Sequence, residues 1–298
     1  MGAASVRSWR FFRGVGAALA AFSLWGAPSM AADDAAVARG KVLFSAGGCA
    51  NCHTDVKNKG TPLAGRRPMK TPFGTFYSPN ITPDPAHGIG KWTDAQFVRA
   101  MREGIAPDGS HYYPVFPYTS FTFMTDADIK AIRAYIFTLP SVAQANRPHE
   151  VGFPFSQRFL QFFWKMLFFE EGPYKPAPGR SAEWNRGAYL ARAVAHCAEC
   201  HTPRNRLGGL DNSISFTGVT AQNGPEGEAV PNIRSDTGRG VSRWSKDQIA
   251  TYLGSGETPE GDFAGSLMFE VIDKGTSELS DEDRAAIATY LKALPPIR

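Results

Sequence analysis

The four cysteines of this chain all belong to two copies of one pentapeptide, Cys-x-x-Cys-His. The first copy spans residues 49–53 and the second spans residues 197–201. Two thiols and an imidazole at this spacing are typical of covalent haem attachment, because the thiols bond to the two vinyl groups and the histidine reaches the iron. The sequence therefore predicts two haem c groups. Their attachment residues and proximal iron ligands are Cys49, Cys52, Cys197, Cys200, His53 and His201.

Three other uses of paired cysteines fit this pattern less well. A zinc site built from two Cys-x-x-Cys pairs normally has its pairs much closer together, and it leaves the histidine after each pair unexplained. A thioredoxin-like dithiol needs a βαβ context. A structural disulfide inside a Cys-x-x-Cys segment is an unusual link in a secreted protein.

The N-terminal segment is typical of a secretory signal. Three arginines, the last of them Arg13, precede an uncharged stretch over residues 14–32 with an apolar centre. The sequence Ser29-Met30-Ala31 then supplies a cleavage site, so we expect a signal peptide over residues 1–31 and a periplasmic mature chain. An uncleaved membrane anchor is the competing interpretation.

Charge argues against a nucleic-acid partner. The formal charge of +4 falls to +1 when the three arginines of the signal are removed, since that segment holds no acidic residue. No basic run interleaved with aromatic residues follows, and such a run is the usual footprint of nucleic-acid binding.

The rest of the chain repeats itself. Pro79-Asn80-Ile81 recurs as Pro231-Asn232-Ile233, and Trp92 recurs as Trp244, both 152 residues later. A second match pairs the segment from Thr125 with the segment from Ser280. Because a repeat in sequence indicates a repeated structural unit, each haem is expected to have its own domain. We place these domains at residues 32–148 and 181–298, with a linker over residues 149–180.

Local signals predict helices at equivalent places in the two units. Thr93 with Gln96, and Ser245 with Gln248, have the spacing of capping boxes. Thr125 and Ser280 are expected N-caps of later helices, and no long alternating strand pattern appears. The predicted fold class is therefore all-α.

The linker contains an aromatic-rich apolar helix over residues 159–169. Its polar stripe is narrow, so most of its circumference must be covered. Packing between the two domains is the favoured interpretation, because exposed patches of that size are uncommon on soluble monomers. A docking surface for a partner or a membrane is the alternative.

A sixth iron ligand is expected for each haem, and methionine raises the reduction potential relative to histidine. Met268, the methionine of the second domain, is predicted as a ligand from a glycine-rich loop over residues 261–269. The first domain has Phe116 at the equivalent position, and phenylalanine cannot bind iron. Met124 is the preferred substitute there, while an open or bis-histidine iron stays an alternative. The other candidates in that domain are Met101, Met69, His87 and His111.

Each proximal histidine needs an oxygen that accepts from Nδ1, because that bond orients the ring and raises its basicity. For His53 the backbone carbonyl of Pro62 is the expected acceptor.

Four segments carry a resemblance to a known family: residues 71–84, 88–92, 184–190 and 196–205. Together they resemble the multihaem cytochrome c subunits of bacterial periplasmic alcohol, gluconate and aldehyde dehydrogenases. The resemblance implies two tandem cytochrome c-like domains, proximal ligands at His53 and His201, and a methionine ligand at Met268. Those subunits typically carry three haem motifs, whereas this chain has two.

The resemblance implies electron flow from a partner dehydrogenase to the respiratory chain, with a quinone, an oxidase or another cytochrome as the acceptor. Peripheral contact with the membrane is part of this expectation. The rival hypothesis is a dihaem enzyme, such as a peroxidase or a sulfur-compound oxidase, in which one iron keeps an exchangeable position. An electron-transfer protein or subunit is favoured over an enzyme acting alone.

Overall fold

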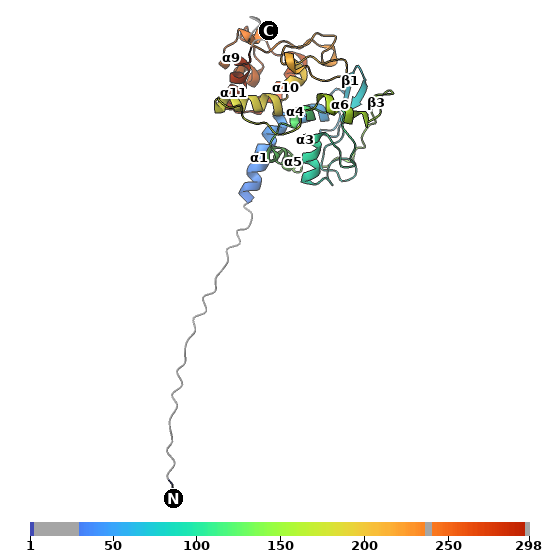
Figure 1. Cartoon of the computed structure of the whole chain (residues 1–298), viewed down its shortest axis with the longest axis vertical. Helices are drawn as coiled ribbons and strands as arrows, with labels where there is room; N and C mark the ends of the chain where they lie inside the picture. Colours follow the sequence, from blue (N-terminus) through green and yellow to red (C-terminus); the bar gives the residue numbers. More distant parts are fainter. Residues whose placement is uncertain (3–29, 236–239, 296–298) are drawn as a thin grey trace.

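The computed structural model describes residues 1–2, 30–235 and 240–295 (Figure 1). The signal predicted over residues 1–31 lies almost entirely outside these residues. The α-helices are α1 (Met30–Ala46), α2 (Cys49–His53), α3 (Asp94–Glu103), α4 (Tyr118–Phe121), α5 (Asp126–Ile136), α6 (Leu160–Phe168), α7 (Ala182–Tyr189), α8 (Ala198–His201), α9 (Lys246–Ser255), α10 (Ser266–Asp273) and α11 (Asp281–Lys292). The strands are β1 (Pro68–Thr71), β2 (Gly74–Tyr77) and β3 (Glu150–Val151).

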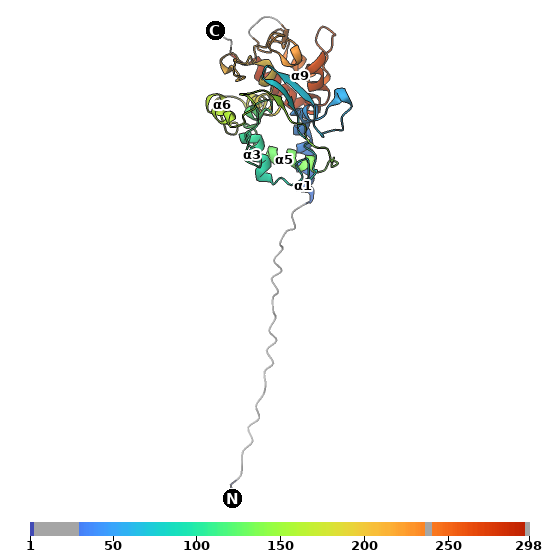
Figure 2. The same cartoon turned by 90° about the vertical axis from the view of Figure 1, so that its right-hand side faces the viewer.

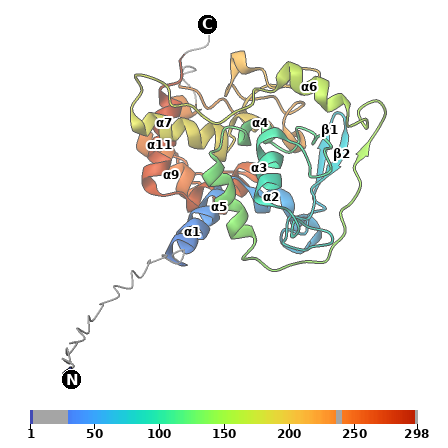
Figure 3. The ribbon, with the colours of Figure 1, turned by 60° about the horizontal axis from the view of Figure 1, so that its bottom comes forward.

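Two matching helix pairs form the core of the molecule. In the first half α1 packs against α5, and in the second half α7 packs against α11 (Figure 3). Each crossing has a glycine at its closest point: a Cβ on Gly40 would lie 1.9 Å from the Ala131 carbonyl oxygen, and one on Gly187 would lie 1.9 Å from that of Ala286. The repeat seen in the sequence therefore has a counterpart in helix packing.

The helix caps predicted from sequence are present. Thr93 and Gln96 form a capping box at the start of α3, and Ser245 and Gln248 form one at the start of α9. Thr125 caps α5 in the same way that Ser280 caps α11, each accepting from the backbone amide three residues later. These caps are local, which is why the residues alone predict them.

The prediction of an all-α fold is wrong, because β1, β2 and β3 form an antiparallel sheet in that order. Thr71 pairs with Gly74 across a two-residue turn, and Gly74 also pairs with Val151. A Cβ on Gly74 would lie 2.4 Å from the Glu150 oxygen, so the approach of β3 requires glycine. Strands of two to four residues are too short to show the alternation that marks a strand in sequence.

Helix α6 lies at the edge of the molecule and touches both halves (Figure 2). Trp164 Nε1 donates to the Leu207 carbonyl at 2.8 Å, and Lys165 Nζ donates to the Gly104 carbonyl at 2.9 Å. Leu160 and Phe168 are half-buried. Four other apolar side chains of α6 and that of its N-cap are between 51 and 69 % exposed: Phe159, Phe162, Phe163, Met166 and Leu167. Burial of most of this helix between the domains was therefore the wrong expectation, since only one side of it packs.

None of the described helices combines the length and the apolar character that crossing a bilayer requires.

Two candidate haem-attachment sites

Each Cys-x-x-Cys-His segment is wound into one helical turn, which projects its side chains from a short helix. The first segment forms α2, and the second begins one residue before α8. A residue with left-handed backbone precedes each segment, Gly48 with φ 61° and His196 with φ 39°. Such a residue redirects the chain, and glycine adopts it without strain. For His196 the left-handed backbone is strained, and a hydrogen bond from its Nε2 to the Gly47 carbonyl at 3.1 Å stabilises it.

The proximal histidines are held in the same way in the two halves. His53 Nδ1 donates to the Pro79 carbonyl at 2.7 Å, and His201 Nδ1 donates to the Pro231 carbonyl at 2.8 Å. With Nδ1 committed to a backbone oxygen, Nε2 is the nitrogen left for a metal. Burial lowers the pKa of both imidazoles, and the carbonyl bonds offset part of that effect. Each ring is thus held neutral, as an iron ligand must be.

This arrangement corrects the prediction of Pro62 as the acceptor for His53. Pro62 is exposed, whereas Pro79 is brought to the histidine by Gly65, whose amide donates to the His53 carbonyl at 2.8 Å. A Cβ on Gly65 would lie 2.5 Å from the Pro79 carbonyl carbon, so the loops meet only because this residue is glycine. The repeat in sequence already marked Pro79 and Pro231 as equivalent positions. It did not show that their carbonyls accept from the histidines, because every residue type has a backbone carbonyl.

The four thiols have the chemistry expected of attachment residues. None of them forms a disulfide. Burial raises the pKa of Cys49 and of Cys197 to about 12, and that of Cys200 to about 11, so these thiols stay protonated near neutral pH. A reactive dithiol, which depends on a thiolate in the free protein, is therefore disfavoured. In the described part of the chain, no three His, Cys, Asp or Glu side chains gather into a metal-binding cluster.

The proposed sixth ligands occupy different surroundings. Met268 lies on helix α10, not in a loop as the glycines before it suggested, and it is half-buried against the core. Met124 is fully buried between α4 and α5, and its carbonyl accepts from Arg102 Nη2 at 2.8 Å. Both residues stay predictions as iron ligands.

Met124 has a counterpart in the second half that bears on its role. It directly precedes the Thr125 cap, as Leu279 precedes the Ser280 cap, and Leu279 is 3 % exposed. In the same way Met101 on α3 corresponds to Leu253 on α9, and both are buried. Each of these two methionines thus occupies a core position that leucine fills in the other half.

The two attachment segments lie against each other's half of the molecule. Asn51 in the first segment donates from Nδ2 to the Glu270 carbonyl of α10 at 2.7 Å. Glu199, the corresponding residue of the second segment, accepts from the hydroxyls of Thr119 and Ser120 on α4, both at 2.7 Å. The residues just before the two segments also meet, since His196 bonds to the Gly47 carbonyl. Segments 148 residues apart in sequence are therefore neighbours in space, which no local pattern predicts.

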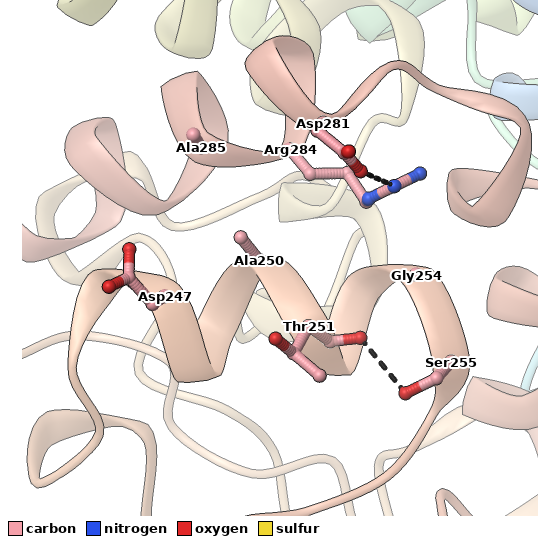
Figure 4. A pocket seen from close by; sticks show the side chains of 8 residues that line it. All are labelled: Asp247, Ala250, Thr251, Gly254, Ser255, Asp281, Arg284 and Ala285. Atoms are coloured by element: carbon pink, nitrogen blue, oxygen red, sulfur yellow. Dashed lines mark hydrogen bonds and ion pairs between the residues drawn. The ribbon is translucent and has the colours of Figure 1, made fainter.

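A separate hollow lies between α9 and α11 (Figure 4). Its lining residues are Asp247, Ala250, Thr251, Gly254, Ser255, Asp281, Arg284 and Ala285. The guanidinium in this set is paired with the Asp281 carboxylate, and the Ser255 hydroxyl donates to the Thr251 carbonyl. The lining contains no cysteine, histidine or methionine, the residues that attach a haem c or bind its iron, so this hollow is separate from the haem sites.

Comparison with known proteins agrees with this geometry. Residues 37–140 and residues 185–295 each match the model of the family described as Cytochrome c. The chain belongs to the cytochrome c family. Both matches contain one Cys-x-x-Cys-His segment and the proline whose carbonyl holds its histidine. The family predicted from sequence is thus confirmed.

The relatives of this cytochrome include a dihaem protein of similar length. They also include longer chains that are named as cytochrome subunits of dehydrogenases, and this chain spans about half to two thirds of their length. It is 46 % identical to a "Diheme cytochrome c-type" protein of Cereibacter sphaeroides, over 87 % of this chain and 86 % of the relative. It is 39 % identical to the "Fructose dehydrogenase cytochrome subunit" of Gluconobacter japonicus, over 87 % of this chain and 52 % of the relative. It is 38 % identical to the "Gluconate 2-dehydrogenase cytochrome c subunit" of Pantoea cypripedii, over 88 % of this chain and 60 % of the relative.

The cytochrome binds two covalently attached haem c groups. The residues present fit these groups, since each segment supplies two protonated thiols for thioether bonds and one neutral imidazole with Nε2 free. When bound, each iron supplies a one-electron couple. The protein orients the imidazoles through Pro79 and Pro231 and brings the two attachment segments together.

Proposed function

We propose that this cytochrome is an electron carrier that accepts electrons from a partner dehydrogenase and delivers them to the respiratory chain. Relatives named as cytochrome subunits of fructose and gluconate dehydrogenases support the donor class. The observation that carries the proposal is that the two attachment segments are neighbours. His196, just before the second segment, bonds to the Gly47 carbonyl, just before the first, and Asn51 and Glu199 each bond to the opposite half. Two haems on neighbouring segments give electrons a path from one haem to the other. An enzyme that reacts at a single iron would not need such a path.

The protein controls this path through the surroundings of each haem. The bonds from His53 to Pro79 and from His201 to Pro231 fix the planes of both imidazoles and raise their basicity. Buried core side chains of both halves limit the access of water, which tunes the potential of each iron. The two halves share one type of proximal bond, so any difference in potential between the haems must come from other contacts.

Reduction of the purified cytochrome by a dehydrogenase tests the proposal. The fully oxidised holoprotein is mixed with a periplasmic dehydrogenase that co-purifies with it, and the haem absorbance is followed after substrate is added. Both haems should be reduced, and a second acceptor should reoxidise them. If dithionite reduces both haems but the dehydrogenase with its substrate reduces neither, the proposal fails.

The periplasm is the proposed location, and peripheral membrane contact through α6 is the proposed arrangement there. The exposed face of α6 consists of Phe, Met and Leu side chains, and Phe153, in the segment that leads to α6, is 85 % exposed. Aromatic and aliphatic side chains of this kind bind at the boundary between headgroups and acyl chains. The acceptor would then be a quinone, an oxidase or another cytochrome.

Flotation with lipid vesicles tests the membrane contact. The double variant Phe163→Ser, Met166→Ser removes two exposed apolar side chains of α6, so the fraction of protein floating with vesicles should fall several-fold. Val56→Ser is the matched control, because Val56 is an exposed apolar residue on the 3-10 turn Val56–Asn58. Equal flotation of the wild type, the double variant and the control would exclude α6 as a membrane contact.

A dihaem enzyme with one exchangeable iron is the second candidate. The observation in its favour is that Met124 and Met101 fill core positions taken by Leu279 and Leu253 in the other half, while Phe116 stands where the second half has Met268. Carbon monoxide added to the reduced protein separates the candidates. Rapid stoichiometric binding at one haem supports the enzyme, and absence of binding at both supports the carrier.

A further inference from the structure

The two haem-attachment segments differ in charge at one equivalent position. The residue before the second cysteine is Asn51 in the first segment and Glu199 in the second. Both side chains reach across to the opposite half, as described above, so they perform the same structural task. Only the second one brings an ionisable group into its segment.

The carboxylate of Glu199 is buried and fully engaged. Its side chain is 8 % exposed. Oε1 accepts from the Thr119 and Ser120 hydroxyls, while Oε2 accepts from Arg204 Nη2 at 2.5 Å. A carboxylate that accepts from two hydroxyls on one oxygen and pairs with a guanidinium on the other is held in its charged form. The group is therefore ionised at neutral pH.

A fixed negative charge beside a haem favours the ferric form, because reduction adds a further negative charge to the iron centre. The Arg204 side chain is 34 % exposed, so solvent screens this cation more than it screens the buried carboxylate. Compensation of the carboxylate charge is therefore incomplete. Beside the first segment, where Asn51 occupies the same place, the exposures are reversed. Arg67 Nη1 donates to the Asn51 carbonyl at 2.7 Å, and the Arg67 side chain is 14 % exposed, whereas its carboxylate partners Glu270 and Glu226 are 40 and 33 % exposed.

We propose that Glu199 is a positioning residue that fixes the second attachment segment against α4 and lowers the reduction potential of the second haem relative to the first. The inference needs the two haems of this cytochrome, but neither the donor nor the acceptor of the proposed electron path. It is therefore testable even if the partner dehydrogenase is wrongly assigned.

The variant Glu199→Gln isolates the charge, because the glutamine oxygen still accepts from the two hydroxyls. A redox titration of the purified holoprotein should show the second haem shifted toward the ferrous form by about tenfold, which corresponds to about 59 mV for a one-electron couple. The second haem is identified as the one missing from a Cys197→Ala, Cys200→Ala variant. Haem content and the unfolding midpoint confirm that each variant is folded.

Two further variants separate tuning from a purely structural effect. Ser120→Ala removes one hydroxyl but keeps the carboxylate, so the potential of the second haem should stay the same or fall. Glu282→Gln removes an exposed carboxylate on α11 and should leave both potentials unchanged. The proposal is overturned if Glu199→Gln leaves the second potential unchanged or lowers it, or if Ser120→Ala raises that potential as Glu199→Gln does.

Discussion

Gly40 on α1 lies so close to Ala131 on α5 that a Cβ at position 40 would come within 1.9 Å of the Ala131 carbonyl oxygen. The neighbouring residue Arg39 is ion-paired with Asp128 of α5, whose side chain is buried. The same glycine contact joins α7 to α11, where Arg186 is paired with Asp283 at 2.6 Å. A close helix crossing with an ion pair beside it is thus the shared construction of the two halves.

Substitution of Gly40 by alanine should destabilise the cytochrome by about 2–3 kcal/mol. The clash is with backbone, so α1 and α5 must separate, and overpacking of this kind costs about that much. Urea unfolding of the holoprotein measures the loss. Gly152→Ala is the control, because nothing lies within 4 Å of a Cβ at that position. Equal midpoints for both variants would show that α1 and α5 can part at this crossing without loss of stability.

The sequence was informative wherever the determining contacts are local. The capping boxes at Thr93 and Ser245 span three residues, and both were predicted correctly. Strand β3 pairs with β2 across more than 70 residues, and its two residues carry no strand signal, so the sheet was missed. The acceptor Pro79 was missed for a related reason, since its carbonyl reaches His53 only through the folded loop at Gly65.

Replacement of Met268 by leucine should lower the potential of one haem by more than about 59 mV, which is tenfold in the reduction equilibrium. Leucine keeps an apolar side chain of similar volume on α10, so the packing of the helix is retained. A redox titration monitored by haem absorbance gives the two potentials. An unchanged titration curve would remove Met268 from the iron and leave it as a core residue.

Met124→Leu tests whether Met124 is the sixth ligand of the first haem, with little disturbance of the core. Leucine is the residue that fills the corresponding position before α11, so the core should accept it with a loss below about 1.5 kcal/mol. If Met124 binds iron, the variant should lose the spectrum of a methionine-ligated haem and should bind carbon monoxide. Met101→Leu is the matched control, because Leu253 fills its counterpart on α9. Identical spectra for both variants would exclude Met124 as a ligand.

Removal of Cys197 and Cys200 together should halve the covalently bound haem. The first segment is held in α2 with its own histidine bond to Pro79, so its attachment does not depend on the second pair. Haem retained by the denatured polypeptide after acidified acetone extraction gives the count. Substitution of Cys49 and Cys52 should produce the complementary half. Retention of two haems by either variant would contradict the attachment scheme.

The stability of the cytochrome should rise with pH on account of Lys165. Burial lowers the pKa of this ammonium group to about 8, and the charges of Glu103 and Glu171 offset part of that shift. In the unfolded chain the pKa of a lysine is about 10.4. Between these two pKa values the unfolded chain holds a proton that the folded chain has released, so the free energy of unfolding increases with pH.

The variant Lys165→Met isolates this contribution. Urea unfolding at several pH values between about 7 and 10 gives the free energy of unfolding for both proteins, and the difference between them should change with the sign just derived. Below about pH 8 the wild type bears the full cost of burying the charge, and that cost should fade as the pH rises. Lys70→Met removes an exposed lysine of β1 and should show a profile parallel to the wild type. Parallel profiles for all three proteins would mean that Lys165 is as well solvated in the folded chain as in the unfolded one, and that α6 does not bury its ammonium group.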